Sequence, residues 1–166
     1  MPAKPANAAP HRLIRDVTFG EEVLVRSFTN LYGCRIGDRT RVGSFVEIQA
    51  GAAIGSDCKI QSHTFICEGV TIGDRVFVGH GVIFINDRTP RATSPDGRLQ
   101  TSEDWELLST IVEDGASLGS GAVILGGVRI GESALVGGGA VVTDHVPAGA
   151  TVAGNPARRL AQQLSG

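Results

Sequence analysis

Aliphatic side chains recur at every sixth position over most of this 166-residue chain. One run of the repeat extends from Ile36 to Phe84, and a second extends from Val112 to Val142. A small or β-branched residue precedes each of these side chains by two positions, and glycine often follows, as in "IGDRT" and "LGSGA". Neither a helical stripe nor strands of ordinary spacing have this period. The pattern therefore indicates very short extended segments, each followed by a tight turn.

Three such segments form one triangular coil, and successive coils pair as parallel strands about 4.8 Å apart. The small residue fits near a corner, the large aliphatic residue fills the centre, and Gly, Asn or Asp supplies the positive φ that a corner needs. The repeat has fifteen large apolar positions, fourteen of them aliphatic and one, Phe84, aromatic. They correspond to five coils, preceded by a looser start at Phe19, Val25 and Leu31. We therefore predict an all-β protein whose fold is a parallel β-helix.

The chain is long enough for one domain with its own core. We expect a flexible leader at residues 1–12 and a single β-helix domain at residues 13–166. The repeat breaks once, at residues 86–110, where Pro, Asp, Arg and the only Trp appear. A loop of this length in a compact solenoid is more often functional than accidental, so we expect it to protrude and wall a pocket. Residues 155–166 are predicted to form a short helical cap.

Charge and cysteine content narrow the possible functions. The formal net charge of −2 lacks the basic excess of nucleic-acid-binding proteins. No apolar run approaches the roughly 20 residues that cross a bilayer, and the N-terminal segment has no signal-peptide core. Cys34, Cys58 and Cys67 form no CxxC pair. We expect reduced core cysteines in a cytoplasmic protein.

The phase of the repeat predicts which side chains share a corner. Residues eighteen positions apart stack, so Asn86 is expected above Glu68, both outward at the corner from which the loop leaves. His63 and His80 fall at a different corner, roughly 16 Å away along one strand segment. That distance is too large for joint chemistry within one chain. A trimer would allow the corner of one subunit to lie beside the loop of another.

Two parts of the chain resemble known enzymes. The C-terminal "GGGAVVTDHVPAGATVAGNPARRL" resembles the end of the hexapeptide-repeat acyltransferases, whose coil is left-handed. The segments "FTNLYGCRIGD" and "SHTFICEGVTIGDRVFVGHGVIFINDRTPRAT" are similar to a narrower group, the nucleotide-sugar 3-N-acetyltransferases. The resemblance implies a homotrimer with sites between subunits and no required metal. It also implies acetyl transfer from acetyl-CoA to the 3-amino group of a dTDP- or UDP-linked amino sugar for bacterial surface polysaccharide.

The resemblance and the stacking together suggest catalytic residues. Glu68 is a candidate to accept the amine proton, provided that burial under the loop raises its pKa. Asn86 is a candidate to orient the amine or to donate to the oxyanion. His80 is the alternative base, because enzymes of this superfamily often use a histidine. Each residue also has a simpler interpretation as a solvated corner residue, since Asn suits a positive φ.

Further residues are expected to bind the two substrates. The acceptor candidates are His63, Asp87, Arg88 and Arg91. Arginine suits a diphosphate, although both arginines also suit ion pairs within the loop. Gly121 and Gly139 leave backbone open for the pantetheine amides of acetyl-CoA. The adenine and phosphate end of the donor is assigned to Ala140, Asn155, Pro156, Arg158 and Arg159.

Three other functions stay open on the sequence. The first is a hexapeptide acyltransferase that acts on the oxygen or nitrogen of another small acceptor. The second is a γ-class carbonic anhydrase on the same prism, which takes two zinc ligands spaced five residues apart from one chain. No two of the four histidines have that spacing, which argues against it. The third is a β-helix without catalytic activity, against which the loop and the acetyl-CoA-like tail argue.

Overall fold

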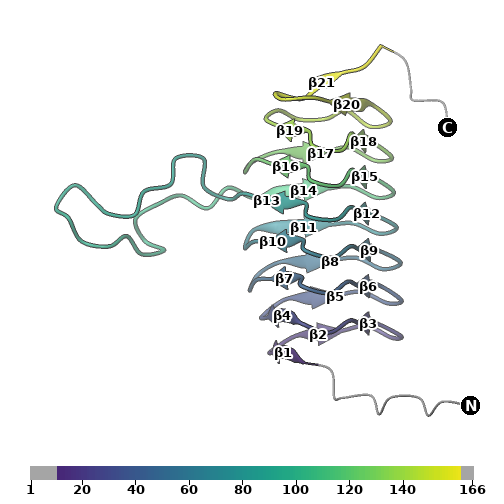
Figure 1. Ribbon diagram of the computed structural model, residues 1–166, viewed down its shortest axis with the longest axis horizontal. Coiled ribbons are helices and arrows are strands. Elements are labelled where there is room, and N and C mark those ends of the chain that lie inside the picture. The colour runs from purple at the N-terminus through teal and green to yellow at the C-terminus, as the bar shows by residue number, and fades with distance from the viewer. Residues whose placement is uncertain (1–10, 162–166) are drawn as a thin grey trace, which may run out of the picture.

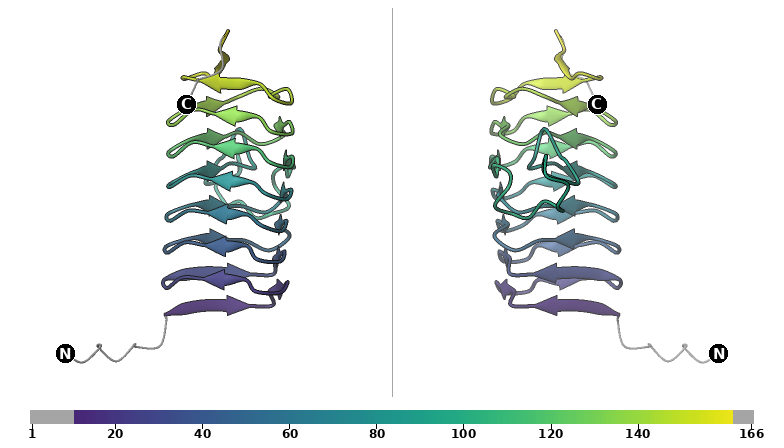
Figure 2. Two further views of the ribbon diagram at one scale, coloured as in Figure 1. Left: turned by 90° about the vertical axis from the view of Figure 1, so that its right-hand side faces the viewer. Right: turned by 90° about the vertical axis from the view of Figure 1, so that its left-hand side faces the viewer.

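The computed structural model describes residues 11–161, which form twenty-one short strands wound into a parallel β-helix (Figures 1 and 2). Three sheets make the faces of the prism. Sheet A contains β1 (Arg12–Arg15), β4 (Thr29–Tyr32), β7 (Glu47–Ile48), β10 (Phe65–Ile66), β13 (Ile83–Phe84), β16 (Val123–Ile124) and β19 (Val141–Val142). Sheet B contains β2 (Thr18–Phe19), β5 (Arg35–Ile36), β8 (Ala53–Ile54), β11 (Val70–Ile72), β14 (Thr110–Val112) and β17 (Arg129–Ile130). Sheet C contains β3 (Leu24–Val25), β6 (Arg41–Val42), β9 (Lys59–Ile60), β12 (Phe77–Val78), β15 (Ser117–Leu118), β18 (Leu135–Val136), β20 (Thr151–Ala153) and β21 (Arg158–Arg159).

The chain visits the three sheets in turn, so that three kinds of corner result. We call them the A–B corner, the B–C corner and the C–A corner, after the sheets that each one joins. The pairing step is seventeen residues at the start of the prism, where Leu24 pairs with Arg41, and sixteen at its end, where Leu135 pairs with Thr151. In between, strand pairing keeps one register: Ile36 pairs with Ile54, and Ile54 pairs with Ile72. Ile72 then pairs with Val112, so the register continues past the loop. The predicted coil of eighteen residues, interrupted once, is confirmed.

The core follows the six-residue repeat. Each of its fifteen large apolar side chains is at most 4% exposed, and Phe84 is the largest of the fully buried ones. Threonine replaces the small inward residue in some coils. Thr40 Oγ1 donates to the carbonyl of Gly55 at 2.8 Å, whereas the buried Thr110 Oγ1, where the chain returns from the loop, has no hydrogen-bond partner within residues 11–161. At the predicted looser start of the prism, Phe19 is 38% exposed, whereas Val25 is nearly and Leu31 fully buried. The start is therefore looser only at Phe19.

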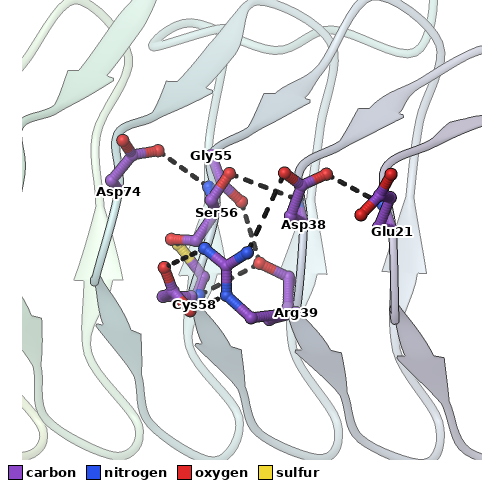
Figure 3. Close-up of polar contacts among 9 residues, drawn as sticks. Glu21, Asp38, Arg39, Gly55, Ser56, Cys58 and Asp74 are labelled. Atoms are coloured by element: carbon purple, nitrogen blue, oxygen red, sulfur yellow. Dashed lines mark hydrogen bonds and ion pairs between the residues drawn. The ribbon is translucent and has the colours of Figure 1, made fainter.

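Polar side chains join successive coils at the B–C corner (Figure 3). In each step, a backbone N–H donates to a side chain one coil further on: Glu21 to Asp38 at 2.8 Å, Asp38 to Ser56 at 3.2 Å and Ser56 to Asp74 at 2.7 Å. The Arg39 guanidinium adds two hydrogen bonds of 2.7 Å to the Asp57 carboxylate. These bonds satisfy backbone donors that a tight corner would otherwise leave unpaired. The B–C corner is therefore structural.

The interruption lies at the A–B corner, between β13 and β14. Residues 85–109 leave the prism there and extend sideways from it (Figure 1). The N–H of Leu108 donates to the carbonyl of Asn86 at 3.1 Å, which closes the base of the loop. The predicted protruding loop at residues 86–110 is thus present, with Thr110 already in β14.

Both ends of the chain require a correction. Residues 1–10 and 162–166 lie outside the described residues. The leader was predicted to reach residue 12, but β1 begins at Arg12 and pairs with β4. The predicted helical cap is wrong up to residue 161, because Gly154–Ala157 form a turn and β21 pairs antiparallel with β20. Strand β20 offers this segment an open edge, and its backbone groups are satisfied by pairing there. Within residues 11–161 no helix is long and apolar enough to span a bilayer.

Candidate functional site

Asn86 and Glu68 stack at the A–B corner, as the eighteen-residue spacing predicts. The side-chain amide of Asn86 donates to the backbone carbonyl of Glu68 at 3.2 Å. Within residues 11–161, Asn86 Oδ1 has no hydrogen-bond partner, and the Glu68 side chain is exposed. In a single chain the loop does not bury Glu68. The burial on which its proposed role as a base depends is therefore absent.

The loop does build a hollow, of about 390 Å³. Its lining residues are Asp87, Arg88, Thr89, Arg91, Gln100, Asp104, Trp105, Glu106 and Leu108. All of them belong to the loop itself. We expected the loop to wall a pocket over the corner of Glu68 and Asn86, with these two residues as its floor, but neither of them lines this hollow. The half-buried Trp105 is the aromatic ring of its lining, which the sequence analysis did not assign to a site.

The two loop arginines differ in what they contact. Arg88 donates from Nε to the carbonyl of Gly126 at 2.8 Å and from Nη2 to the carbonyl of Thr143 at 3.2 Å. It thereby ties the loop to the A–B corners of later coils, and this position does not match the predicted role in binding substrate phosphate. Arg91 is exposed and donates to the carbonyl of its neighbour Pro90. Asp87 accepts the N–H of Thr89 at 2.7 Å and so shapes the start of the loop.

An ion pair closes the outer part of the loop. The guanidinium of Arg98 donates two hydrogen bonds to the Asp104 carboxylate, at 2.8 and 2.5 Å. Asp104 also accepts the N–H of Thr101 at 2.7 Å. The hydrogen bond from Arg98 is the main reason that the pKa of Asp104 lies well below its usual range. The carboxylate is therefore ionised throughout the neutral and mildly acidic range.

Four rings stack along the first half of the C–A corner. His11, Phe28, Phe45 and His63 have successive centroid distances of 5.7, 5.2 and 4.8 Å, with interplanar angles of at most 18°. Phe28 and Phe45 have φ values of +62° and +59°, a region that side chains rarely adopt. Each is 53% exposed. We call these four residues the aromatic column.

His80 lies at the same corner, one coil after His63. Its Nδ1 is 2.8 Å from the hydroxyl of Ser62, and its backbone N–H donates to Ser120 Oγ at 3.1 Å. The histidine ring is exposed. Strand β13 separates His80 from Asn86, so the prediction that they occupy different corners is confirmed.

Beyond His80 the C–A corner carries no side chains at its left-handed positions. Gly81, Gly121 and Gly139 have φ values of +65°, +72° and +68°. A Cβ at Gly81 or Gly139 would meet no atom within 4 Å, and one at Gly121 would meet only the backbone of Gly139, at 3.9 Å. We call this stretch the bare corner. It is the open backbone that we predicted at Gly121 and Gly139.

The C-terminal turn continues the bare corner. Ala153 follows the register of Gly137, so Gly154, Asn155 and Pro156 come one coil after Gly138 and Gly139, and all three are exposed. Ala140 is an exception among the predicted donor-binding residues. It is 0% exposed because its side chain points into the prism, so its predicted contact with the donor is wrong.

Arg158 and Arg159 lie in β21 beside a second hollow, of about 280 Å³. Arg158 Nη1 is 3.8 Å from the Asp144 carboxylate, and both arginines are exposed. His145 also lines this hollow, and its Nδ1 accepts the N–H of Arg129 at 3.0 Å. The two arginines are thus placed to meet an anion at the C-terminal end of the prism.

Neither a thiol nor a metal site accompanies these groups. Cys34, Cys58 and Cys67 are buried and unpaired. Burial raises the pKa of Cys67 to about 11, and it also raises the pKa of Cys34 and Cys58. Such thiols are poor nucleophiles. In residues 11–161 no group of three or more His, Cys, Asp or Glu side chains is arranged to hold a metal ion.

The six-residue repeat and the coil match a described family. The family model of the bacterial transferase hexapeptide (six repeats) matches residues 33–68, 51–86 and 109–144, which together cover more than half of the chain. The chain belongs to the bacterial hexapeptide transferases. The loop falls between the matched ranges, so the family match describes the prism and leaves the loop unassigned.

Curated relatives match part of the chain. The bifunctional protein GlmU of Shouchella clausii (strain KSM-K16) is 36% identical over 115 residues, which are 69% of this chain and 22% of GlmU. The 2,3,4,5-tetrahydropyridine-2,6-dicarboxylate N-acetyltransferase of Staphylococcus aureus (strain MRSA252) is 41% identical over 92 residues, 55% of this chain and 33% of that enzyme. The chain thus spans a third or less of the length of these relatives.

A solved structure shares the fold. A point mutant of AntD, an N-acyltransferase from Bacillus cereus in complex with dTDP and coenzyme A, superposes with a TM-score of 0.75. It is 19% identical, and the match covers 88% of this chain and 83% of AntD. At this identity the likeness establishes the β-helix and no more.

Proposed function

We propose that this protein is an acetyltransferase that moves acetyl from acetyl-CoA to the amino group of a nucleotide-linked amino sugar, with a 3-amino group as the first choice. One observation carries the proposal. A single corner of a hexapeptide-transferase prism changes from stacked rings to bare glycine backbone, and His80 lies where it changes. Acetyl-CoA is a long molecule, so its site needs an open stretch of surface such as the bare corner. The reaction also needs a base at the end of that stretch.

The bare corner is the proposed donor site. Gly121, Gly139 and the Gly154–Ala157 turn form a continuous stretch with no side chain at the left-handed positions of the coils. Pantetheine carries two amide groups that pair well with exposed backbone, and glycine allows close approach. Arg158 and Arg159 lie at the far end, where the phosphates of acetyl-CoA would meet positive charge.

The loop hollow is the proposed nucleotide site. Trp105 offers a flat ring to a pyrimidine base, and such stacked pairs contribute about 0.5–1.5 kcal/mol beyond the buried area. Arg91 has a guanidinium that is exposed and able to bind a diphosphate. Asn86 and Glu68, at the foot of the loop, would then meet the sugar and orient its amine.

In the proposed reaction the neutral amine attacks the thioester carbonyl carbon, a C–N bond forms, and the C–S bond breaks. His80 accepts the proton that the nitrogen loses and returns it to the departing thiolate, which leaves as CoA. Glu68 is exposed in the single chain, and His80 is already oriented by Ser62, so we prefer His80 as the base. Asn86 and Glu68 are assigned to positioning.

We further propose a homotrimer in which the loop of one subunit walls the bare corner of another. Sheet A joins the two corners, and Phe65, Ile83, Val123 and Val141 form a row along its outer face through paired registers. Ile83 is 43% exposed in the single chain. A neighbour packed against this row would bury apolar surface and bring its own loop toward His80.

The Staphylococcus relative supports a second acceptor, tetrahydropyridine-2,6-dicarboxylate, because its identity reaches 41%. Two carboxylates need converging cations. The loop hollow contains Arg88, whose guanidinium is bound to two backbone carbonyls, and Arg91, which is accompanied by Asp87 and Glu106. With Asp104, the lining holds three carboxylates and one free guanidinium, so it offers no pair of converging cations to two separate carboxylates, whereas Trp105 can stack on a base, and we therefore prefer the nucleotide sugar.

Two measurements test the acceptor. Release of free CoA thiol is followed with acetyl-CoA and a panel of dTDP- and UDP-linked amino sugars, with tetrahydropyridine-2,6-dicarboxylate included. The buried cysteines of the protein leave little background in this assay. In parallel, dTDP and UDP are titrated against the fluorescence of Trp105, the only tryptophan of the chain.

We expect turnover of at least one nucleotide sugar and a saturable fluorescence change with its nucleotide. Arg91→Ala should weaken nucleotide binding about 10-fold, the usual effect of a lost charged hydrogen bond. Arg41→Ala serves as a control, because Arg41 is an exposed arginine of β6 and does not line the hollow. Turnover of the dicarboxylate alone, with no response of Trp105 to either nucleotide, would overturn the nucleotide-sugar proposal.

A further inference from the structure

A serine contacts the proposed base in the coil that precedes it. Ser62 and His80 occupy the same position of the C–A corner in neighbouring coils, and their side chains meet at 2.8 Å between Oγ and Nδ1. The coil stacking fixes this contact, since the N–H of Gly81 donates to the carbonyl of Ser62 at 3.0 Å directly beside it. Within residues 11–161 no hydrogen bond involves Nε2 of His80.

The chain contains a second histidine, His145, whose hydrogen-bond direction is fixed by its partner. His145 Nδ1 lies 3.0 Å from the backbone nitrogen of Arg129. A backbone N–H can only donate, so Nδ1 of His145 must be the acceptor and its proton must reside on Nε2. A serine hydroxyl imposes no such choice, because it can donate or accept. At His80 the direction of the bond therefore decides which ring nitrogen is free to act.

We propose that Ser62 is a positioning residue for the reaction: its hydroxyl oxygen accepts the Nδ1 proton of His80 and so presents Nε2 as the unprotonated nitrogen. This inference rests on the proposed function. The hydrogen bond at one ring nitrogen sets the role of the other, and here it selects the tautomer that neutral histidine adopts less often on its own. With Nδ1 held by Ser62, Nε2 is the atom that receives the amine proton and passes it to the CoA thiolate.

A spectroscopic measurement tests the tautomer without any substrate. In ¹⁵N-labelled protein, long-range ¹H–¹⁵N correlation spectra at neutral to mildly alkaline pH report the protonated nitrogen of each histidine. His80→Gln identifies the His80 signals, and His145 supplies the Nε2–H pattern for comparison. We expect wild-type His80 to show the Nδ1–H pattern and Ser62→Ala to shift it toward the pattern of His145. An Nε2–H pattern for His80 in the wild type, or no change in Ser62→Ala, would overturn the proposal.

Kinetics test the consequence. Ser62→Ala should lower kcat about 10-fold, part of the effect that a general base contributes, while KM for acetyl-CoA changes less than about twofold. Ser62→Thr keeps the hydroxyl and should restore most of the lost rate. Ser56→Ala is the matched control, because Ser56 occupies the equivalent place at the B–C corner and accepts the N–H of Asp38.

Equal losses in Ser62→Ala and Ser56→Ala would point to a general structural effect and reject positioning. If the wild type acetylates no amino sugar, the proposed function fails, and the spectra still decide whether Ser62 holds the ring of His80.

Discussion

The two halves of the C–A corner share one backbone and differ in what the backbone carries. Before His80 the left-handed positions hold Phe28, Phe45 and His63, whose rings stack at 4.8–5.2 Å. After His80 the same positions are Gly81, Gly121 and Gly139, with φ values in the same narrow range of +59° to +72°. Backbone geometry therefore does not explain the glycines.

The comparison separates two reasons for glycine at a turn. A left-handed residue with a side chain costs roughly 1 kcal/mol more than glycine, and the aromatic column shows that this fold tolerates the cost. At Gly37 and Gly55 a Cβ would come within 2.7 Å of the next coil, so glycine is sterically required there. At Gly139 nothing stands within 4 Å, so neither the backbone conformation nor crowding by the next coil requires glycine there, and the proposed donor site gives it a reason.

The largest loss of activity is expected from substitutions at His80, where the two halves of the C–A corner meet, and at Asn86, at the foot of the loop. His80→Ala and Asn86→Ala should each lower kcat/KM by about 10²–10⁴-fold, because a base or an orienting contact is lost. If the site lies between subunits, unfolding and refolding an equal mixture of the two variants should restore activity, since about a quarter of random interfaces then carry both native residues. Mixtures that stay inactive, or a monomer in light scattering, would refute the shared site.

Filling the bare corner should give the next largest effect. Gly139→Phe extends the aromatic pattern into the bare half and places a ring where we expect pantetheine. Acetyl-CoA affinity should fall about 10- to 100-fold in calorimetric titration, by steric exclusion and lost backbone contacts. The melting temperature should fall by only a few degrees, since Phe45 already adopts this conformation. Unchanged affinity in the folded variant would place the donor elsewhere.

Removing a ring from the other half should affect stability and leave catalysis intact. Phe45→Ala loses stacking on both Phe28 and His63, which we expect to lower the free energy of unfolding by about 1–2 kcal/mol. Phe45→Gly should be less destabilising than Phe45→Ala, because glycine removes the penalty of the positive φ. Chemical denaturation compares the three proteins. A drop in acetyl-CoA affinity as large as that of Gly139→Phe would contradict the division of the corner.

The smallest effect concerns the loop that the bare corner is proposed to face. Asp104→Ala breaks the contact with Arg98 and should speed trypsin cleavage in the loop roughly 3- to 10-fold, with the melting temperature unchanged. Glu103→Ala, the neighbouring exposed carboxylate, is the control.

The pKa of Asp104 is lowered in the fold, so the ion pair stabilises the loop above the ordinary carboxyl pKa and is lost only as pH falls through the lowered value. Loop opening in the wild type should therefore stay constant between about pH 5 and 8 and should contribute no change in the cleavage rate over that range.

Some of the candidate site followed from spacing alone. The eighteen-residue coil correctly placed Asn86 above Glu68, and the same count puts His80 above Ser62, because stacking in a solenoid depends only on the count of residues. The count also puts Phe45 and His63 at one position, but Phe28 precedes Phe45 by only seventeen residues, so the aromatic column follows from the shorter first coils of the structure. Spacing fails inside the loop, where no period exists and where Arg88 reaches back to Gly126.

The sequence by itself determined the prism, the position of its one interruption and the corner that each residue occupies, because a six-residue repeat leaves one way to bury its aliphatic side chains. Only the tertiary structure decided which groups are free to act. It committed Arg88 to two backbone carbonyls, buried Ala140, bound Nδ1 of His80 to Ser62 and turned the expected C-terminal helix into strand β21. These outcomes depend on side-chain hydrogen bonds and on an open sheet edge, which arise between coils far apart in the chain and have no period to reveal them.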